Sequence, residues 1–301
     1  MNQLVLAIPT YNCARFLPAT LSSLNAQDSH VQWHLQDGAS DDGSVEIARQ
    51  FQRPGDTIVS ERDGGQTDAL NRAFRRMGGE IVGFINGDDC LLPGAAECVL
   101  RIFEEHPDVN LVCGGIEWID VDGDVQGSHT GRIETLREML DIYNVWWNRR
   151  QWVQPEVFYR RTLWERVGGF DTRYHLAFDY DFWVRCFLAG ARVRHLPQRL
   201  AQFRHHSAQK SNASEQAADE IRDIVQRHLG AAQLPFGGRV ALQARLSYDL
   251  YQSGRQPGPR APLWTELIRH PEWLAVPEVR RRLQTACSAR LSRAQGLPPS
   301  S

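Results

Sequence analysis

The stretch that decides the fold is Glu80-Ile81-Val82-Gly83-Phe84-Ile85, which is followed by Asn86-Gly87-Asp88-Asp89. Its short apolar run predicts a strand that ends on two adjacent carboxylates. In open α/β sheets, ligands bind at the carboxyl ends of the strands, and carboxylate oxygens there suit Mg²⁺ or Mn²⁺ together with phosphate groups. The alternative is a solvated turn in which Asp88 or Asp89 caps the helix that opens at Pro93.

Strand and helix patterns alternate on both sides of this segment. The strands are expected at residues 4–8, 31–35, 57–60 and 80–85, and the helices at residues 14–26, 44–51, 66–77 and 93–105. Such alternation with short connections is typical of βαβ units in a mostly parallel sheet. Because the crossovers are right-handed, every strand-to-helix loop should lie on one edge of that sheet.

The pattern changes after Asn110. A long apolar run at 111–119 precedes the turn signal Asp122-Gly123, which predicts a hairpin. Further expected elements are helices at 134–142 and 179–188, two short strands within 193–203 broken at Pro197, and helices from residue 214 onward interrupted by a Pro/Gly-rich break at 256–262.

Composition limits the functional classes. The formal net charge of −2 argues against a nucleic-acid-binding protein, which would carry a strong basic excess. No apolar stretch approaches the roughly 20 residues that span a bilayer, and the first residues lack the pattern of a signal peptide. The six cysteines form no Cys-x-x-Cys pair, so we expect neither a zinc site nor a disulfide framework. These features predict a cytoplasmic protein. Lys210 is the only lysine in the sequence, which indicates a GC-rich coding genome more than a mechanism.

Three further polar clusters follow the other expected strands. They are Pro9-Thr10-Tyr11-Asn12, then Asp37-Gly38-Ala39-Ser40-Asp41-Asp42-Gly43-Ser44, and Asp63-Gly64-Gly65-Gln66 with Ala69 and Asn71. Each could be ordinary turn chemistry, with Thr10, Asn12, Asp42 or Ser44 as a helix cap. Four clusters that converge at successive strand ends indicate a ligand site, with Asp37 at the tip of its strand.

In this order the motifs resemble a family 2 glycosyltransferase of the GT-A fold, the inverting and nucleotide-sugar-dependent class. The resemblance runs from Leu4 to about Ser211, and it also includes Gly168-Gly169-Phe170-Asp171, the segment Phe178-Asp179-Tyr180-Asp181-Phe182-Trp183-Val184-Arg185, and Arg204-His205-His206. It implies a mostly parallel central sheet flanked by helices, with a C-terminal helical extension.

The resemblance also implies roles for individual residues. Donor binding falls to Thr10, Tyr11, Asp37, Gln66 and Asp88. Asp89 would coordinate a divalent cation, Mn²⁺ or Mg²⁺, that bridges the two phosphates of the donor. His206 would complete the metal site, with His205 as its competitor and a surface-loop histidine as the alternative for either.

Asp179 matches the catalytic base of similar enzymes. An acceptor hydroxyl needs a carboxylate within hydrogen-bond reach, and in-line attack then inverts the anomeric carbon. Asp179 and Asp181 differ by two positions, so they face different directions on a helix and one alone can serve. The family's usual Glu-Asp pair is Phe178-Asp179 here, which keeps the base and loses the preceding acid. The alternative for Asp179 is a helix N-cap.

The expected acceptor side includes Gln154-Pro155-Glu156-Val157-Phe158 and the tryptophans 146, 147 and 152, of which at least two should pack in the core. We therefore expect a glycosyltransferase domain at 1–210, with a nucleotide-sugar half at 1–120 and an acceptor half at 121–210, and an extension at 211–301. The arginine-rich tail can lie on an anionic membrane or form a solvated helix face.

The sequence thus predicts a metal-dependent hexosyl- or N-acetylhexosaminyltransferase that uses a UDP-sugar and a saccharide or lipid-linked acceptor in cell-surface polysaccharide synthesis. We expect it in the cytoplasm or at the inner face of the membrane. The competing hypothesis is a nucleotide-sugar-binding module without catalysis, against which the intact Asp179 weighs.

Overall fold

The computed structural model describes residues 3–27, 31–207, 209–210, 214–253 and 263–294. Contacts divide the chain into two compact units, residues 1–221 and 222–301, which we describe separately. The first unit is a mixed α/β structure with one sheet flanked by helices, so the predicted fold class is confirmed. The predicted division into a nucleotide-sugar half and an acceptor half stays a prediction.

Four parallel strands form the first part of the sheet, in the order β3-β2-β1-β4. They are β1 (Leu4–Thr10), β2 (Val31–Asp37), β3 (Thr57–Ser60) and β4 (Ile81–Phe84). Every residue of β1 is buried, as expected for a central parallel strand with both faces covered. The pairing register aligns Thr10 with Asp37 and Asp37 with Ser60, so the polar strand ends meet at one edge as predicted.

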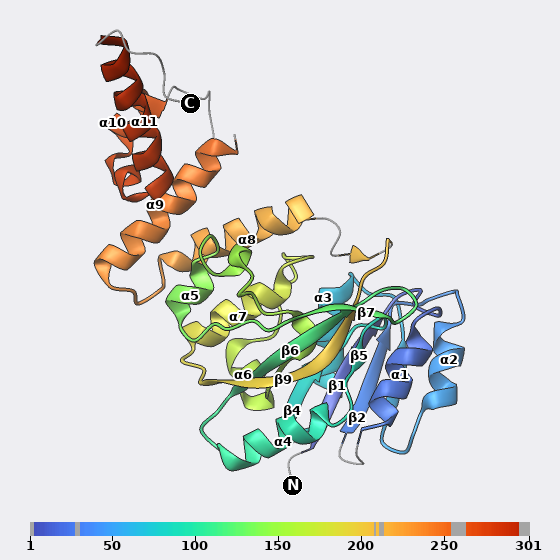
Figure 1. Cartoon of the computed structure of the whole chain (residues 1–301). Helices are drawn as coiled ribbons and strands as arrows, with labels where there is room; N and C mark the ends of the chain where they lie inside the picture. Colours follow the sequence, from blue (N-terminus) through green and yellow to red (C-terminus); the bar gives the residue numbers. More distant parts are fainter. Residues whose placement is uncertain (1–2, 28–30, 208, 211–213, 254–262, 295–301) are drawn as a thin grey trace. The chain divides into compact units, whose positions relative to one another are not determined.

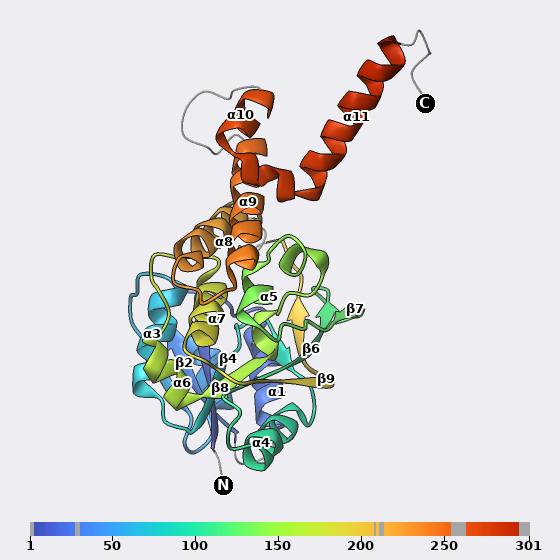
Figure 2. The ribbon, with the colours of Figure 1, turned by 90° about the vertical axis from the view of Figure 1, so that its left-hand side faces the viewer.

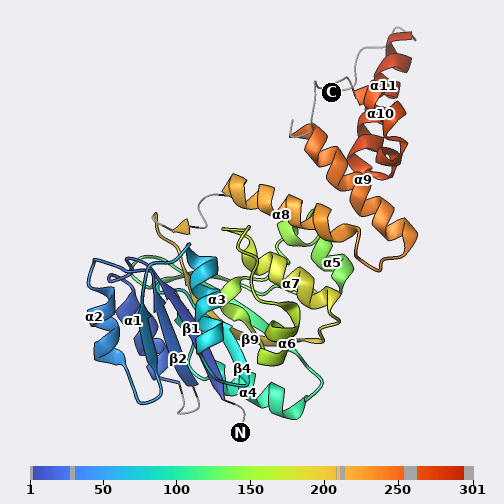
Figure 3. The same cartoon turned by 180° about the vertical axis from the view of Figure 1, so that it is seen from behind.

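Helices cover both faces of this part of the sheet. Figures 1 and 3 view it from opposite sides, with α1 on one face and α3 on the other. The connecting helices are α1 (Leu17–Asn25), α2 (Ser44–Phe51), α3 (Gln66–Arg76) and α4 (Ala95–Glu105). Leucines of α1 pack with β1 and β2 in the main apolar core.

The second part of the sheet mixes parallel and antiparallel strands in the order β4-β8-β6-β9-β5. The strands are β5 (Cys90–Leu91), β6 (Leu111–Ile119), β7 (Val125–His129), β8 (Val157–Arg160) and β9 (Val193–Arg204). β6 and β7 form the predicted hairpin, and Gly123 adopts φ 95° in its turn.

The prediction of two short strands broken at Pro197 was wrong, because β9 runs continuously from Val193 to Arg204. It pairs with β6 in parallel, and the register shifts between the pairs Cys113–His195 and Gly115–Arg199. The proline therefore falls at a bulge, where the absence of an N–H costs no ladder hydrogen bond. Because β9 continues past the bulge, its last residue reaches the turn that follows β4.

The remaining described elements of the first unit are α-helices and short 3-10 helices. They are α5 (Leu136–Leu140), η1 (Trp146–Asn148), η2 (Gln154–Glu156), α6 (Arg161–Val167) and α7 (Phe178–Leu188), followed by α8 (Ser214–Leu229), which runs past residue 221. Phe170, Phe178 and Phe182 pack ring against ring between α7 and the sheet. The N-terminal turn of α7 is thereby fixed over the end of β4, through the Phe84–Phe178 contact.

The second unit contains the remaining helices (Figure 2). They are α9 (Phe236–Gln252), α10 (Leu263–Arg269), η4 (Pro271–Ala275) and α11 (Pro277–Ala294). Fully buried Trp273 contacts Tyr248 and Tyr251 at the centre of a small core. The predicted Pro/Gly-rich break at 256–262 lies outside the described residues. In the described part of the chain, no helix is long and apolar enough to cross a membrane.

Candidate active site

The turn after β4 holds two adjacent carboxylates in different environments. Asp89 is 1% exposed. Its Oδ1 accepts a hydrogen bond from the backbone N–H of Arg204 at 3.0 Å, and its Oδ2 accepts one from Asn86 Nδ2 at 3.2 Å. Burial and the nearby charge of Asp88 raise the pKa of Asp89, and the two N–H donors oppose that rise. Asp89 therefore faces inward, whereas the side chain of Asp88 keeps 19% exposure.

Neither carboxylate caps the following helix. The N-cap of α4 is Gly94, and no side chain accepts a hydrogen bond there. The predicted alternative of a capped turn is therefore wrong. The first helix likewise begins after Phe16 without a side-chain cap, so Thr10 and Asn12 are not caps either.

Arg204 fastens this turn to two other segments. Its Nε donates to the carbonyl of Asp88 at 2.9 Å, and its Nη1 donates to the carbonyl of Asp120 at 2.9 Å. Its guanidinium lies 5.1 Å from the centre of the Phe16 ring. With 5% exposure, Arg204 is a buried clamp that was missing from the predicted site residues. The available signal was its position directly before the histidine pair.

The structure brings His206 to Asp88 and turns His205 away. The Nε2 atom of His206 lies 2.9 Å from Asp88 Oδ2, and its side chain is 12% exposed. His205 stacks instead on Trp118, with ring centres 4.9 Å apart. Of the two competing histidines, His206 is thus the one that shares a place with the carboxylates, and it is not a free surface-loop histidine.

The side chains at this turn fit a divalent cation that also binds phosphate. Mg²⁺ in proteins is commonly held by one or two carboxylates with substrate phosphates and water completing the shell. Asp88 and His206 can supply two partly exposed ligand atoms, whereas both Asp89 oxygens already accept N–H bonds. Within the described ranges, no group of three or more His, Cys, Asp or Glu side chains gathers to hold a metal by itself.

The predicted nucleotide-binding residues lie at the ends of β1 and β2. Tyr11 is 67% exposed. A Cβ at Gly38 would lie 3.0 Å from Asp63 Oδ2 and 3.3 Å from Tyr11 Cδ2, so only glycine allows these side chains to approach the backbone. An exposed aromatic ring beside a carboxylate offers a face for a nucleobase and an acceptor for its N–H groups.

Thr10 and Asp37 lie deeper in the same edge. Thr10 is 4% exposed and Asp37 fully buried. The carboxylate of Asp37 accepts hydrogen bonds from the backbone and hydroxyl of Ser40 and from the Ser60 hydroxyl at 2.6 Å. Asp37 thereby holds the loop that follows β2. Its contact with a nucleotide stays a prediction.

A chain of amides links Gln66 to the β4 turn. Gln66 Nε2 donates to Asn86 Oδ1 at 2.7 Å, and Asn86 Nδ2 donates to Asp89 and, at 3.3 Å, to Gln154 Oε1. Gln154 in turn donates to the carbonyl of Phe84. The predicted acceptor segment at η2, whose residues Gln154, Pro155 and Glu156 are all buried, therefore supports the β4 turn through the hydrogen bonds of Gln154.

Asp179 lies in the first turn of α7. Burial raises the pKa of Asp179 to about 6, against the hydrogen bond from the Tyr180 N–H at 2.7 Å and the charge of Lys210. A carboxyl with a pKa near the working pH can both exist as the base and accept a proton effectively. The predicted base thus has chemistry that suits the role.

Asp179 is not the N-cap, because the cap of α7 is Ala177 and a glutamate from α8 bonds the helix end. Glu220 accepts hydrogen bonds from the backbone N–H groups of His175, Leu176 and Ala177 at 3.1, 2.8 and 2.8 Å. The sequence carries no local signal for this contact, because it joins residues more than forty positions apart.

Asp181 has a structural environment. It is 1% exposed and pairs with Arg185 at 2.7 Å, and Arg185 also donates to the carbonyls of Val167 and Gly169. Asp181 is therefore engaged by Arg185, and Asp179 is the other carboxylate of α7, outside this ion pair.

The tryptophans of the expected acceptor side differ in burial. Trp152 is 2% exposed, and Trp146 is half-buried against Tyr180. Trp147 is 40% exposed and contacts Tyr143 edge-on. One of the three is fully in the core, so the expectation for two is met only in part.

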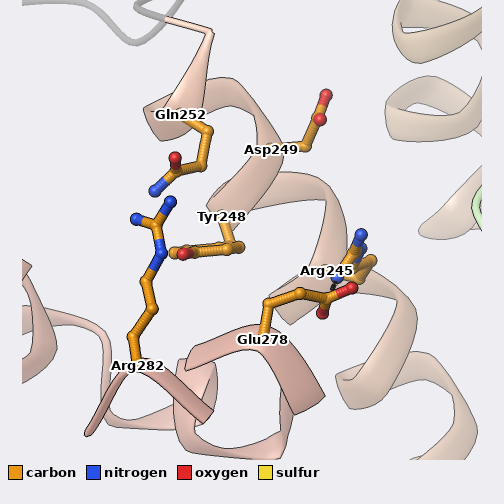
Figure 4. Close-up of a pocket in the computed structure, with 6 residues that line it drawn as sticks. All are labelled: Arg245, Tyr248, Asp249, Gln252, Glu278 and Arg282. Carbon is orange, nitrogen blue, oxygen red and sulfur yellow. Dashed lines mark hydrogen bonds and ion pairs between the residues drawn. The ribbon is translucent and has the colours of Figure 1, made fainter. Parts of the chain in front are cut away.

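The second unit has a cavity of about 210 Å³ lined by charged and polar side chains (Figure 4). Arg245 pairs there with Glu278, and Asp249 pairs with Arg222 at 2.7 Å. The carboxylates of this cavity are paired with guanidinium groups, so we interpret the cavity as part of the ion-paired packing between helices. None of the predicted site residues lies in it.

The chain is similar in sequence to known proteins. A family model described as Glycosyl transferase family 2 matches residues 5–170. The PGL/p-HBAD biosynthesis glycosyltransferase of Mycobacterium bovis (strain BCG / Pasteur 1173P2) is 32% identical over 193 residues, covering 62% of this chain and 70% of that protein. A Mycobacterium tuberculosis (strain CDC 1551 / Oshkosh) protein described as uncharacterized is 32% identical over 220 residues, covering 67% of this chain and 66% of that protein. The chain spans about two thirds of the length of these relatives.

Solved structures show the same fold at low sequence identity. S. aureus TarS (residues 1–349) in complex with UDP-GlcNAc has a TM-score of 0.64 and 17% identity, covering 83% of this chain and 73% of that chain. Mannosyltransferase PcManGT from Pyrobaculum calidifontis, in complex with GDP-Man and Mn²⁺, has a TM-score of 0.60 and 18% identity, covering 94% of this chain and 83% of that chain. The match of the family model over residues 5–170, more than half of the chain, shows that the chain belongs to glycosyl transferase family 2.

Proposed function

Given this membership, we propose that the chain transfers a sugar from a UDP-sugar to a saccharide or lipid-linked acceptor, with inversion at the anomeric carbon and with Mn²⁺ or Mg²⁺ as cofactor. The observation that carries the proposal is the 2.9 Å contact of His206 with Asp88, at the end of β4 and on the edge where Thr10 and Asp37 align.

The donor's two phosphates would lie against this turn. The predicted ligands Asp89 and His206 would hold the divalent cation together with Asp88, and the two N–H bonds that Asp89 accepts would also anchor the turn. When bound, such a cation stabilises the negative charge that grows on the leaving diphosphate. Tyr11 would offer its exposed ring to the nucleobase.

Asp179 would act on the acceptor. As the acceptor oxygen bonds to the anomeric carbon, the bond from that carbon to the diphosphate breaks, and the hydroxyl proton passes to the Asp179 carboxylate. The side chain must be ionised to accept the proton, so transfer should fail in acid. The pKa of about 6 favours activity above that pH.

Two related folds support a nucleotide-sugar donor, although they differ in nucleotide: UDP-GlcNAc in TarS and GDP-Man in PcManGT. We favour a UDP-linked hexose or N-acetylhexosamine and a role in cell-surface polysaccharide synthesis. The proposal includes a location in the cytoplasm or at the inner face of the membrane, for which the arginine-rich tail is the support.

A donor screen tests this proposal. We expect one or a few nucleotide sugars, with Mn²⁺ present, to raise the melting temperature, because a ligand that binds the native state stabilises it. Those donors should then release UDP in the presence of an acceptor array. Binding without turnover on any acceptor would favour the non-catalytic module, and no stabilisation by any nucleotide sugar would contradict the proposal.

A further inference from the structure

The one lysine of the chain lies at the proposed site. Of the 34 lysine and arginine residues, 33 are arginine, and Lys210 is the exception. Its Nζ donates to Gln66 Oε1 at 3.3 Å and lies 5.9 Å from the centre of the Phe178 ring. A compact ammonium group fits such a place between an amide and a ring, where the wider planar guanidinium presents a different donor geometry.

Lys210 begins a directed chain of hydrogen bonds. An ammonium group can only donate and a carboxylate can only accept. With Lys210 at one end and Asp89 at the other, the amides of Gln66 and Asn86 must both present oxygen toward the lysine side and nitrogen toward Asp89, as they do. Lys210 and Asp89, from the two ends of the chain of hydrogen bonds, therefore favour the same orientation of the two donor-side amides.

The same ammonium group acts on Asp179. The positive charge of Lys210 lowers the pKa of Asp179, and the carboxylate of Glu220 raises it. Other charged groups near α7 have different partners. Asp181 and Arg185 pair with each other, and exposed His175 donates its backbone N–H to Glu220. The charge of Asp141 affects the pKa of Tyr180, and that of Arg166 affects the pKa of Cys186.

We propose that Lys210 is a positioning residue of the transfer reaction, whose ammonium group orients the Gln66–Asn86 amides on the donor side and supplies the positive charge that acts on Asp179 on the acceptor side. This inference rests on the proposed function. It adds a residue that connects the two halves of the site.

A single lysine makes a direct test possible without any substrate. Reductive methylation with ¹³C-formaldehyde keeps the positive charge and labels Lys210 and the chain's amino terminus. We expect the Lys210 methyl signal to inflect near pH 6, where Asp179 titrates, and Asp179→Asn to abolish that inflection. Lys210→Arg, which lacks the signal, assigns it. No inflection, or one that survives Asp179→Asn, would overturn the inference.

The pH dependence of transfer gives the second readout. Lys210→Met should move the acidic limb of kcat/KM from near pH 6 to higher pH, because the ammonium group of Lys210 opposes the rise that burial causes in the pKa of Asp179. Lys210→Arg should leave the limb in place. An unmoved limb in Lys210→Met overturns the positioning role but leaves the proposed function intact. Failure of every donor to bind contradicts the proposed function and leaves the methyl inflection as it was.

Discussion

The turn after β4 and the first turn of α7 each carry a carboxylate whose pKa is raised by burial, Asp89 and Asp179, yet they hold it in different ways. At the β4 turn, both oxygens of Asp89 accept N–H bonds and Arg204 fastens the surrounding backbone. On α7, Glu220 bonds the helix end, and Asp179 is left with a pKa of about 6. A carboxylate held by an N–H bond at each oxygen suits a rigid anchor for a diphosphate, and one with fewer such bonds suits a proton acceptor.

The largest effect should follow from Asp179→Asn. Removing a general base typically lowers the rate by 10²- to 10⁴-fold. We expect that loss in kcat, with UDP affinity unchanged, because the base proposed at Asp179 would act on the acceptor hydroxyl and not on the nucleotide. Asp122→Asn, in the β6–β7 turn, is a matched control. Transfer by Asp179→Asn at the wild-type rate would show that Asp179 is not the catalytic base.

Removing Asp181, the other carboxylate of α7, should lower the stability of the fold. Asp181→Ala leaves Arg185 without its buried partner, and breaking a buried ion pair costs about 3–5 kcal/mol. Denaturant unfolding of Asp181→Ala and Asp179→Ala measures the contrast. Equal stabilities of the two variants would contradict the division between a structural and a chemical carboxylate.

At the β4 turn, Arg204→Met tests whether the anchor is rigid. The carbonyls of Asp88 and Asp120 would lose their charged donor, at about 1–3 kcal/mol each. We expect a lower unfolding free energy and weaker binding of UDP. If Arg204→Met unfolded with the same denaturant midpoint as the wild type, the Arg204 clamp would contribute nothing to the stability of the fold.

The smallest effect concerns pH and stability. The pKa of Asp179 is raised from 3.8 to about 6 in the folded state, so folding favours its protonated form. The stability that the protonated Asp179 contributes to the folded state is present below about pH 4 and is lost as the pH rises through 6. Asp179→Asn lacks this loss, so its melting temperature relative to wild type should rise between pH 4 and pH 7. A constant difference would argue against the raised pKa.

The sequence predicted the strand ends well because short strands with glycine- and aspartate-rich ends carry local signals. Thr10, Asp37 and Asp88 follow directly from where β1, β2 and β4 stop. Contacts between distant segments left no such signal. Glu220 becomes visible as a site residue only when α8 packs against the start of α7, and the position of Arg204 before the histidine pair does not reveal its bonds to the β4 turn.

Strand continuity was misjudged for a related reason. Pro197 argued for a break, but the long-range pairing of β9 with β6 absorbed it as a bulge. The direction of side chains was equally hidden. Asp88 and Asp89 are adjacent in the sequence. Their different partners, His206 for Asp88 and the Arg204 N–H for Asp89, distinguish the partly exposed carboxylate from the inward one.

The most direct test of the account is the affinity of UDP measured by calorimetry with Mn²⁺ and after chelation, in wild type and in Asp88→Asn. If Asp88 and His206 hold a cation that bridges the diphosphate, Mn²⁺ should tighten UDP binding at least tenfold, about 1.4 kcal/mol, in wild type and not in Asp88→Asn. Equal affinity for UDP with and without Mn²⁺ in the wild type would contradict the metal site at the β4 turn.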